Sequence, residues 1–220
     1  MSPLRVVFFG PPGAGKGTQA KLLEQKFGAC QVSTGEILRK AARDETALGK
    51  ETGDYLDRGD LVPDHLMVKL VAGRLREPDC KSGFILDGFP RTIAQADNLE
   101  RMLQGSELAL KSALCLQAPN DVLIKRLSGR RTCKNCGSLF HMVFNPPAKP
   151  GVCDRCGGEL YQREDDREDK IAARLKVYEN QTAPLKEYYR KRGLLKEIDG
   201  VGSVEEVRDR VFESLGASGT

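Results

Sequence analysis

The sequence lacks long hydrophobic runs, a strong excess of either charge and any low-complexity segment. No apolar stretch approaches the roughly 20 residues that a helix needs to cross a bilayer, and residues 6–9 are too short for the apolar core of a signal peptide. The net charge of +4, from 35 basic and 31 acidic side chains, is too small to indicate a dedicated nucleic-acid-binding protein. We therefore expect a cytoplasmic protein that binds neither membrane nor nucleic acid, and its 220 residues suit one substantial domain.

Short β-like segments alternate with longer helical patterns along the chain. The predicted strands cover residues 5–9, 30–32, 83–86, 112–116 and 194–198. The predicted helices cover residues 18–27, 64–76, 93–103, 120–127, 170–192 and 204–215. Ser203 and Glu206 form a capping-box pattern before the last helix. The alternation predicts an α/β fold, a parallel five-stranded sheet flanked by helices.

Two segments interrupt this alternation, and we expect them to form inserted lobes. Residues 33–62 follow the second predicted strand and contain short helical patterns separated by glycines. Residues 126–163 include a stretch rich in Cys, Gly and Pro that is too long for an ordinary loop unless something else stabilises it. The predicted core domain then consists of residues 1–32, 63–125 and 164–220.

The segment GPPGAGKGT follows the first predicted strand and opens a helix, the context that a phosphate-binding loop requires. Glycines allow the backbone amides to surround phosphate groups, the helix N-terminus adds positive potential, and Lys16 can reach the β- and γ-phosphates of a nucleotide. The alternative is a glycine-rich turn without a ligand, and the agreement of strand, loop, Lys and helix argues against it. The predicted loop residues are Gly10, Pro11, Pro12, Gly13, Ala14, Gly15, Lys16, Gly17 and Thr18. Gly17 stands where such loops carry a hydroxyl, so magnesium binding by Thr18 is a weaker prediction than the phosphate loop itself.

Asp87 and Arg91 belong to the segment GFILDGFPRT. Asp87 ends an apolar strand, and a carboxylate at that edge of a parallel sheet, beside a phosphate-binding loop, is placed to hold Mg²⁺ directly or through water. Arg91 follows on the same edge, where its guanidinium can bind a phosphate with two hydrogen bonds. Because an Asp at a strand end is often only a turn residue, this assignment depends on the neighbouring loop.

Four cysteines form two Cys-x-x-Cys pairs separated by 16 residues. They are Cys133, Cys136, Cys153 and Cys156. This spacing is typical of a tetrahedral zinc site, and with four thiolates no position is left open, so we expect a structural Zn²⁺. A pair of disulfides is the alternative, which an intracellular protein disfavours.

The other cysteines and one histidine carry weaker signals. Cys30, Cys80 and Cys115 are scattered in the sequence, and we expect each to be a buried free thiol. His141 lies close to the cysteine pairs, but because four thiolates already complete a site we expect it to be a surface or packing residue.

Arginines flank the cysteine-rich segment on both sides. They are Arg126, Arg130 and Arg131 before it, and Arg163, Arg167 and Arg174 after it. A run of charges usually marks a solvated helix face, but these residues lie at the two roots of a predicted lobe. Closure of the lobe would bring them over the phosphate loop, where they can stabilise a transferring phosphoryl group. Their expected partners in an open state are Asp165, Asp166 and Asp169.

Taken together, these motifs resemble the adenylate kinase family, in its long form with a zinc-containing lid. The segments GPPGAGKGTQA, STGEILR, GDLVPD, ILDGFPRT, GRRTCKNCG, FNPP and QTAPL follow the family's order and spacing over nearly the whole chain. The resemblance implies Mg²⁺-dependent, reversible transfer of the γ-phosphoryl group of ATP to AMP, giving two ADP, by a monomer with structural Zn²⁺. Some zinc-containing relatives have Asp as the fourth ligand, where this chain has Cys156.

The resemblance also implies a role for each matching residue. The ATP-binding set is the phosphate loop with Arg126, Arg130, Phe140 and the backbone of Gly202. The AMP-binding set is Thr34, Arg39, Asp60, Leu61, Val62, Gly88, Arg91, Gln95, Arg163 and Arg174. The residues expected to act in catalysis are Lys16, Asp87, Arg91, Arg126, Arg163 and Arg174. Residues 33–62 correspond to the family's AMP-binding lobe and residues 126–163 to its lid.

Other functions remain open at this point. A kinase for another nucleoside monophosphate, or one that uses GTP as donor, would share these motifs, because single hydrogen-bonding residues set such preferences. A remoter alternative is a P-loop protein whose zinc segment binds nucleic acid, but that segment offers few aromatic side chains for base stacking: Phe140, Phe144 and Tyr161.

Overall fold

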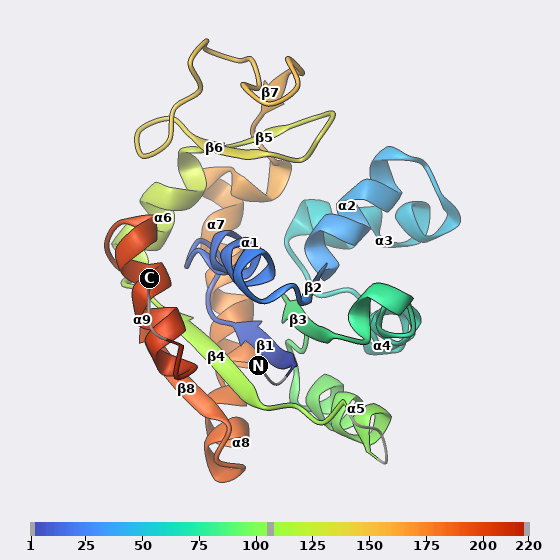
Figure 1. Ribbon diagram of the computed structural model, residues 1–220. Coiled ribbons are helices and arrows are strands. Elements are labelled where there is room, and N and C mark those ends of the chain that lie inside the picture. The colour runs from blue at the N-terminus through green and yellow to red at the C-terminus, as the bar shows by residue number, and fades with distance from the viewer. Residues whose placement is uncertain (1–2, 105–107, 218–220) are drawn as a thin grey trace.

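A parallel five-stranded sheet lies at the centre of the computed structural model, which describes residues 3–104 and 108–217 (Figure 1). Its strand order is β2-β3-β1-β4-β8. The strands are β1 (Leu4–Phe9), β2 (Cys30–Ser33), β3 (Gly83–Asp87), β4 (Ser112–Gln117) and β8 (Leu195–Asp199). The predicted strand bounds are therefore right to within one or two residues, and the predicted fold class is confirmed.

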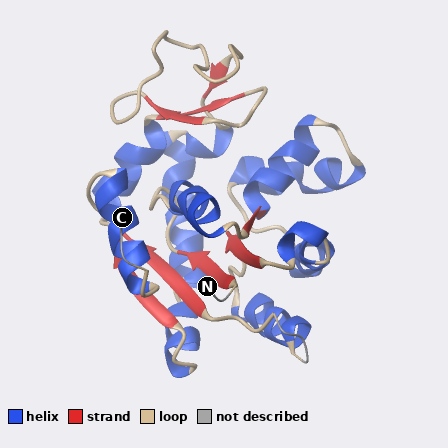
Figure 2. Cartoon of the chain, in the orientation of Figure 1, coloured by secondary structure: helices blue, strands red, loops and turns tan. Residues whose placement is uncertain are grey.

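The three central strands, β1, β3 and β4, are buried on both faces, since their successive side chains point to opposite sides of the sheet and both sides are covered by helices. In β1, Val6 and Phe8 pack on one side with α1 (Lys16–Phe27) and α9 (Val204–Ser214). Val7 and Phe9 pack on the other side, in the cluster that includes residues of α4 (Asp64–Leu75), α5 (Ile93–Leu103) and α8 (Leu185–Lys191). The result is a sheet between two layers of helices, with the central strands enclosed (Figure 2).

The register of the sheet aligns the carboxyl ends of three neighbouring strands. Phe8 pairs with Asp87, and Asp87 pairs with Ser33 on its other side. The chain leaves all three strands at this edge, so the loop after β1 lies next to the residues that end β2 and β3. A parallel sheet commonly binds its ligand at such an edge.

The two interrupting segments contain secondary structure of their own. Residues 33–62 hold α2 (Thr34–Arg43) and α3 (Ala47–Arg58), which lie beside the sheet on the right in Figure 1. The cysteine-rich segment forms a separate antiparallel sheet of β5 (Arg130–Cys133), β6 (Leu139–His141) and β7 (Leu160–Tyr161). This small sheet lies at the top of the view, above α6 (Asn120–Ser128) and α7 (Glu168–Val177).

One predicted helix, residues 170–192, is wrong as a single element. It is divided into α7, a π-helical turn η3 (Tyr178–Thr182) and α8. The amide of Ala183 donates to the carbonyl of Tyr178 at 2.9 Å, a bond that spans five residues. Pro184 follows and has no amide hydrogen to continue a regular helix, which accounts for the change in winding.

The expectation of three free thiols is also wrong for two of them. Cys30, at the start of β2, forms a disulfide with Cys80, in the 3₁₀ turn η1 (Pro78–Cys80) before β3. The two positions are 50 residues apart, but β2 and β3 are neighbours in the sheet. Cys115 in β4 is a buried free thiol, as predicted.

The described residues include no helix that is long and apolar enough to cross a membrane.

Candidate active site

The phosphate-binding loop connects β1 to α1 and has the backbone that its glycines permit. Gly10, Gly13 and Gly15 have φ angles of 138°, 84° and 98°, which only glycine adopts readily. At Gly10 a side chain would also collide with the carbonyl oxygen of Leu116 in β4. Helix α1 begins directly after the loop, at Lys16, so its free amides face the loop.

Lys16 lies folded back over this loop. Its Nζ donates hydrogen bonds to the carbonyls of Gly10 and Pro11, at 2.9 and 2.8 Å. Burial lowers the pKa of Lys16 to about 8, although the negative charge of Asp87 opposes that shift. The ammonium group is therefore held by two neutral carbonyls and, within residues 3–104 and 108–217, forms no direct ion pair, so it remains available to a phosphate.

Asp87 ends β3 beside the loop. It accepts a hydrogen bond from the Ser33 hydroxyl at 3.2 Å, and a Cβ on Gly17 would lie 3.3 Å from its Oδ2. Burial raises the pKa of Asp87, while the charge of Lys16 lowers it. Carboxylate and hydroxyl oxygens are the ligands that Mg²⁺ prefers, and Asp87 and Thr18 line the same cavity.

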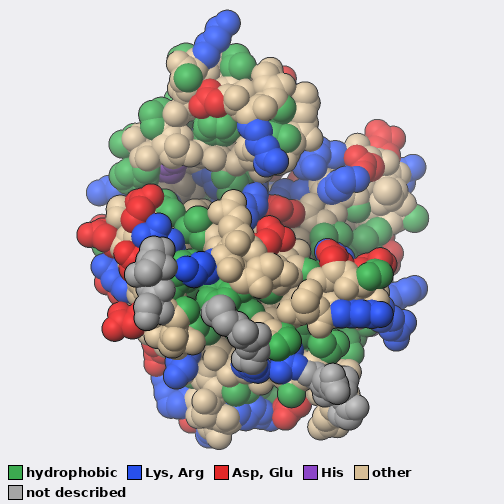
Figure 3. All heavy atoms as spheres, in the orientation of Figure 1, with side chains coloured by type: hydrophobic (Ala, Val, Ile, Leu, Met, Phe, Trp, Pro, Cys, Tyr) green, Lys and Arg blue, Asp and Glu red, His purple; other side chains and the backbone are tan. Residues whose placement is uncertain are grey.

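That cavity has a volume of about 960 Å³ and is bounded by the loop and the small sheet. Of the residues predicted to bind ATP, it is lined by Pro12, Gly13, Ala14, Gly15, Lys16, Gly17, Thr18, Arg126, Arg130, Phe140 and Gly202. Gly10 lines a smaller neighbouring cavity, and Pro11 contributes its carbonyl to Lys16. Figure 3 shows the hollow between the upper lobe and the body, with Lys and Arg side chains gathered beside it.

Arg126 connects α6 to the loop after β8, and both elements line this cavity. From α6 its guanidinium donates to the carbonyl of Gly200 at 2.9 Å, in the loop after β8. Burial lowers the pKa of Arg126, and Asp199 opposes the shift. The carbonyl of Gly202 lies at 3.5 Å from the same side chain, and Gly202 lines the cavity.

The arginines at the roots of the small sheet meet two aspartates of the 3₁₀ turn η2 (Glu164–Asp166). Arg130 donates to both oxygens of Asp166, at 2.7 and 2.5 Å, and Arg174 donates to Asp166 at 2.7 Å and pairs with Asp165 at 3.2 Å. Despite the cost of burial, the charges of Arg130 and Arg174 keep the pKa of Asp166 below its usual value. These pairs were predicted, as was the pairing of Asp169, which lies 3.6 Å from Arg167.

Arg163 differs from Arg130 and Arg174 in its hydrogen-bond partner. It is 6% exposed, and its Nε donates to the Thr132 hydroxyl at 2.9 Å. Burial and the nearby charge of Arg130 lower its pKa. Because this bond to a neutral hydroxyl uses one of the five N–H donors, the buried guanidinium retains donors for an anionic ligand.

A second, smaller cavity of about 40 Å³ lies between the segment 33–62 and the rest of the domain. It is lined by Thr34, Arg39, Asp60, Leu61, Val62, Arg91, Gln95 and Arg174, all predicted to bind AMP, together with residues such as Leu38, Leu56 and Met67. Gly88 lies next to it, because a Cβ at this position would be 3.1 Å from both Thr34 Oγ1 and Arg91 Nη2. Arg39, Arg91 and Arg174 line both this cavity and the large one, so positive charge stands where the two meet.

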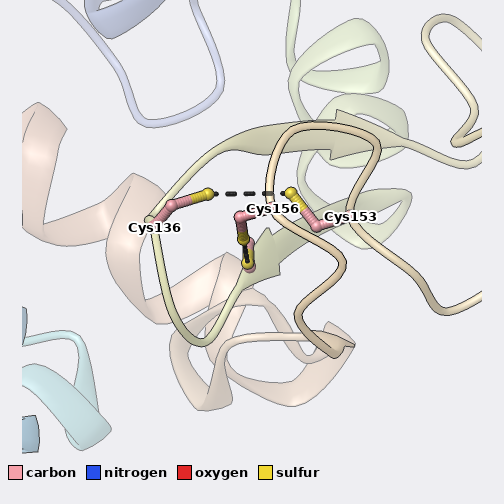
Figure 4. A group of neighbouring side chains, drawn as sticks. Cys136, Cys153 and Cys156 are labelled. Carbon is pink, nitrogen blue, oxygen red and sulfur yellow. Dashed lines mark hydrogen bonds between the residues drawn. The ribbon is translucent and has the colours of Figure 1, made fainter.

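The four paired cysteines come together in the small sheet. Their sulfur atoms lie within 4.8 Å of one another, with Cys133–Cys156 at 3.5 Å and Cys136–Cys153 at 3.6 Å (Figure 4). Four thiolates around zinc at about 2.3 Å would be separated by about 3.8 Å, so the cluster fits a tetrahedral metal ion. The apolar residues packed with it are few, namely Leu160 and Phe140.

Sequence patterns did not reveal several residues at these sites. His141, expected to be a surface or packing residue, stacks on Phe144 with ring centroids 4.4 Å apart, and it also lines the large cavity. Asp64 and Thr182 hold the backbone and side chains of the AMP-binding set, through contacts with residues 28 to 91 positions away. Asp64 and Thr182 lie in the segments GDLVPD and QTAPL, but no local pattern shows which residues they contact, because these partners are distant in the sequence.

Positive charge surrounds the large cavity and a phosphate loop forms one wall, so the fold and the site define a P-loop phosphotransferase. The family model for adenylate kinase matches residues 8–194. The adenylate kinase of Thermodesulfovibrio yellowstonii is 53% identical over 96% of this chain and 99% of its own length. Those of Syntrophobacter fumaroxidans and Archaeoglobus fulgidus are 49% and 48% identical, over 97% and 93% of this chain and 100% and 94% of their own lengths. The chain belongs to the adenylate kinase family.

Proposed function

We propose that this protein transfers the γ-phosphoryl group of Mg-ATP to AMP, reversibly, to give two ADP. The observation that carries the proposal is the junction of two cavities at one set of arginines. The large cavity contains the phosphate loop, the small one adjoins it, and Arg39, Arg91 and Arg174 line both. Two nucleotides bound with their phosphates at this junction would have donor and acceptor side by side.

The donor site is assigned to the large cavity. The loop amides and Lys16 hold the β- and γ-phosphates, Arg126 and Arg130 approach from the side of the small sheet, and Phe140 covers the base. Mg²⁺, bound by phosphate oxygens with Asp87 and Thr18 nearby, would neutralise charge on the transferring group.

The acceptor site is assigned to the small cavity. Arg39 and Arg91 bind the AMP phosphate, while Thr34, Gln95, Gly88 and residues 60–62 contact the base. The acceptor is already an oxyanion, so the reaction needs no general base. Arg163 and Arg174 then stabilise the charge that spreads over the phosphoryl group in the transition state.

We further propose that residues 126–163 form a lid over the donor, held together by structural Zn²⁺, and that residues 33–62 form the AMP-binding lobe. In the described structure Arg130 and Arg174 are bound to Asp166. If the lid closes over bound phosphates, these guanidinium groups gain a new anionic partner. We therefore expect Arg130 and Arg174 to exchange Asp166 for the phosphates as the lid closes. We also propose a monomer located in the cytoplasm.

The test is phosphoryl transfer from Mg-ATP or Mg-GTP to AMP, GMP, CMP and UMP, with nucleoside diphosphates separated by chromatography. Preferred formation of ADP from ATP and AMP is the expected result. Preference for another acceptor or for GTP would overturn the assignment of the base sites but not the phosphotransferase class. Failure of folded, metal-loaded protein to transfer to any acceptor would overturn the proposed function.

A further inference from the structure

Gln95, in the first turn of α5, lies in a closed ring of hydrogen bonds at the wall of the small cavity. Its Nε2 donates to Asp64 Oδ1 at 2.6 Å, and its Oε1 accepts from the amide of Arg91 at 2.7 Å. Asp64 Oδ2 accepts from the Thr92 hydroxyl at 3.1 Å, and that hydroxyl accepts from the amide of Gln95 at 3.1 Å. Gln95 is 1% exposed and lines the cavity, so its side chain is fixed within the site wall.

The chemistry of these partners allows only one orientation of the Gln95 amide. A carboxylate only accepts hydrogen bonds, and a backbone amide only donates them. If the side-chain amide were rotated by half a turn, its oxygen would face Asp64 and its nitrogen would face the amide of Arg91. Both contacts would then be repulsive, and two pairs of partly buried groups would lose their hydrogen bonds.

In this fixed orientation, the Gln95 side-chain amide has one N–H hydrogen and one oxygen lone pair that bond to none of the described residues. A side chain that lines the cavity can present these to a base as one donor, Nε2, beside one acceptor, Oε1. The Watson–Crick edge of adenine is the complement, since N1 accepts and the 6-amino group donates. Hypoxanthine and guanine have the opposite pattern, because N1–H donates and O6 accepts.

We propose that Asp64 is a specificity-determining residue that selects 6-aminopurine monophosphates by fixing the orientation of the Gln95 amide. Asp64 does not line the cavity and is a positioning residue. Two groups fix the orientation of the Gln95 side-chain amide: the carboxylate of Asp64 and the backbone amide of Arg91. A side-chain substitution cannot remove the backbone amide, but it can change the carboxylate. This inference rests on the proposed function, in which the small cavity holds AMP.

The experiment measures kcat/KM for AMP and for inosine monophosphate with Mg-ATP as donor. The two acceptors differ only at position 6 and in the proton on N1, so their ratio reports the orientation of the amide. Asp64→Asn is isosteric and can donate to a rotated Gln95, which removes one of the two repulsive contacts. The AMP preference should fall at least about tenfold, since leaving one buried group unpaired typically costs a tenfold factor or more.

The control is Asp121→Asn, which makes the same change in the first turn of another helix, at an exposed position. Its ratio should remain that of the wild type. A folded Asp64→Asn enzyme whose ratio stays within about twofold of the wild type would overturn the inference. A loss of activity toward both acceptors by the same factor would do so too, because it would show a structural role alone.

A second variant covers the case in which Asp64→Asn does not fold. Thr92→Val removes the hydroxyl that orients the Asp64 carboxylate and should lower the AMP preference in the same direction; an unchanged ratio in that folded variant would overturn the inference. The wild-type enzyme separates this inference from the function on which it depends. If it does not phosphorylate AMP, the proposed function itself fails, whatever the variants do.

Discussion

Asp166 and Arg174 are joined by a hydrogen bond of 2.7 Å, and the Asp166 carboxylate is completely buried. Arg130 binds the same carboxylate from the other side. One aspartate therefore holds two arginines from different segments, one at the start of the small sheet and the other on α7. A nucleotide phosphate carries the same sign of charge and, like this carboxylate, can accept two hydrogen bonds from a guanidinium, so Asp166 occupies the place of the anion that the arginines are proposed to bind.

The first prediction concerns this pair of arginines. Asp166→Asn should lower the free energy of unfolding by about 3–5 kcal/mol, because it removes the paired carboxylate of Arg130 and one of the two carboxylates that pair with Arg174. Saturating ADP should restore more stability to the variant than to the wild type, since its phosphates replace the missing charge. Denaturant unfolding with and without ADP measures both effects.

Asp169→Asn is the control for this variant. Asp169 is exposed and lies 3.6 Å from Arg167, so its loss should change the free energy of unfolding by less than about 1 kcal/mol. An Asp166→Asn variant as stable as this control would show that the buried carboxylate is not needed to hold the arginines.

The second prediction concerns pH. Because burial lowers the pKa of Lys16 to about 8, its charge in the free enzyme is present below that pH and is lost as pH rises through it. kcat/KM for Mg-ATP reports the free enzyme and should decline above about pH 8. kcat at saturating ATP should stay constant to a higher pH, because bound phosphates favour the charged ammonium.

Lys16→Arg tests whether Lys16 causes this alkaline decline. A guanidinium keeps its charge over the whole range, so the decline in kcat/KM should disappear even if the variant is slower overall. A decline that persists unchanged in Lys16→Arg would assign it to another group.

The third prediction concerns the four-cysteine cluster. Purified protein should contain one zinc ion per chain by elemental analysis, and Cys153→Ser or a strong chelator should remove it. The segment 126–163 should then become sensitive to proteases, because the metal replaces a core that is otherwise very small. Cys115→Ala, outside the cluster, should keep the metal. Full protease resistance after metal removal would show that the lobe folds without it.

The fourth prediction concerns the disulfide between β2 and η1. A cross-link that closes a loop of 50 residues restricts the unfolded chain, so reduction should lower the free energy of unfolding by about 4 kcal/mol. Unfolding of oxidised and reduced protein measures the difference. Cys80→Ala should be insensitive to the reductant, and Cys115→Ala should respond like the wild type. Equal stability in both redox states would show that the bond does not stabilise the fold.

Much of this protein could be predicted from contiguous stretches of its sequence. The strands and most helices follow from hydrophobic patterns that repeat over a few residues, and the capping box of Ser203 and Glu206 is present as predicted. The phosphate loop can be predicted for the same reason, because the first strand, the glycines of the loop and Lys16 follow one another directly in the sequence. The spacing of the two cysteine pairs is visible in the sequence and predicts the four-cysteine cluster.

Contacts between distant segments were decided only by the tertiary structure. Cys30 and Cys80 are 50 residues apart in the sequence, and only the pairing of β2 with β3 brings them together. Asp64 fixes Gln95, a residue of the small cavity's wall, only because α4 and α5 pack side by side and place the two side chains in contact. Local patterns depend on backbone geometry over a few residues, whereas these contacts depend on how whole elements pack. The sequence by itself therefore determined the class of chemistry, and the packing of the elements determined which side chains hold the reacting groups in place.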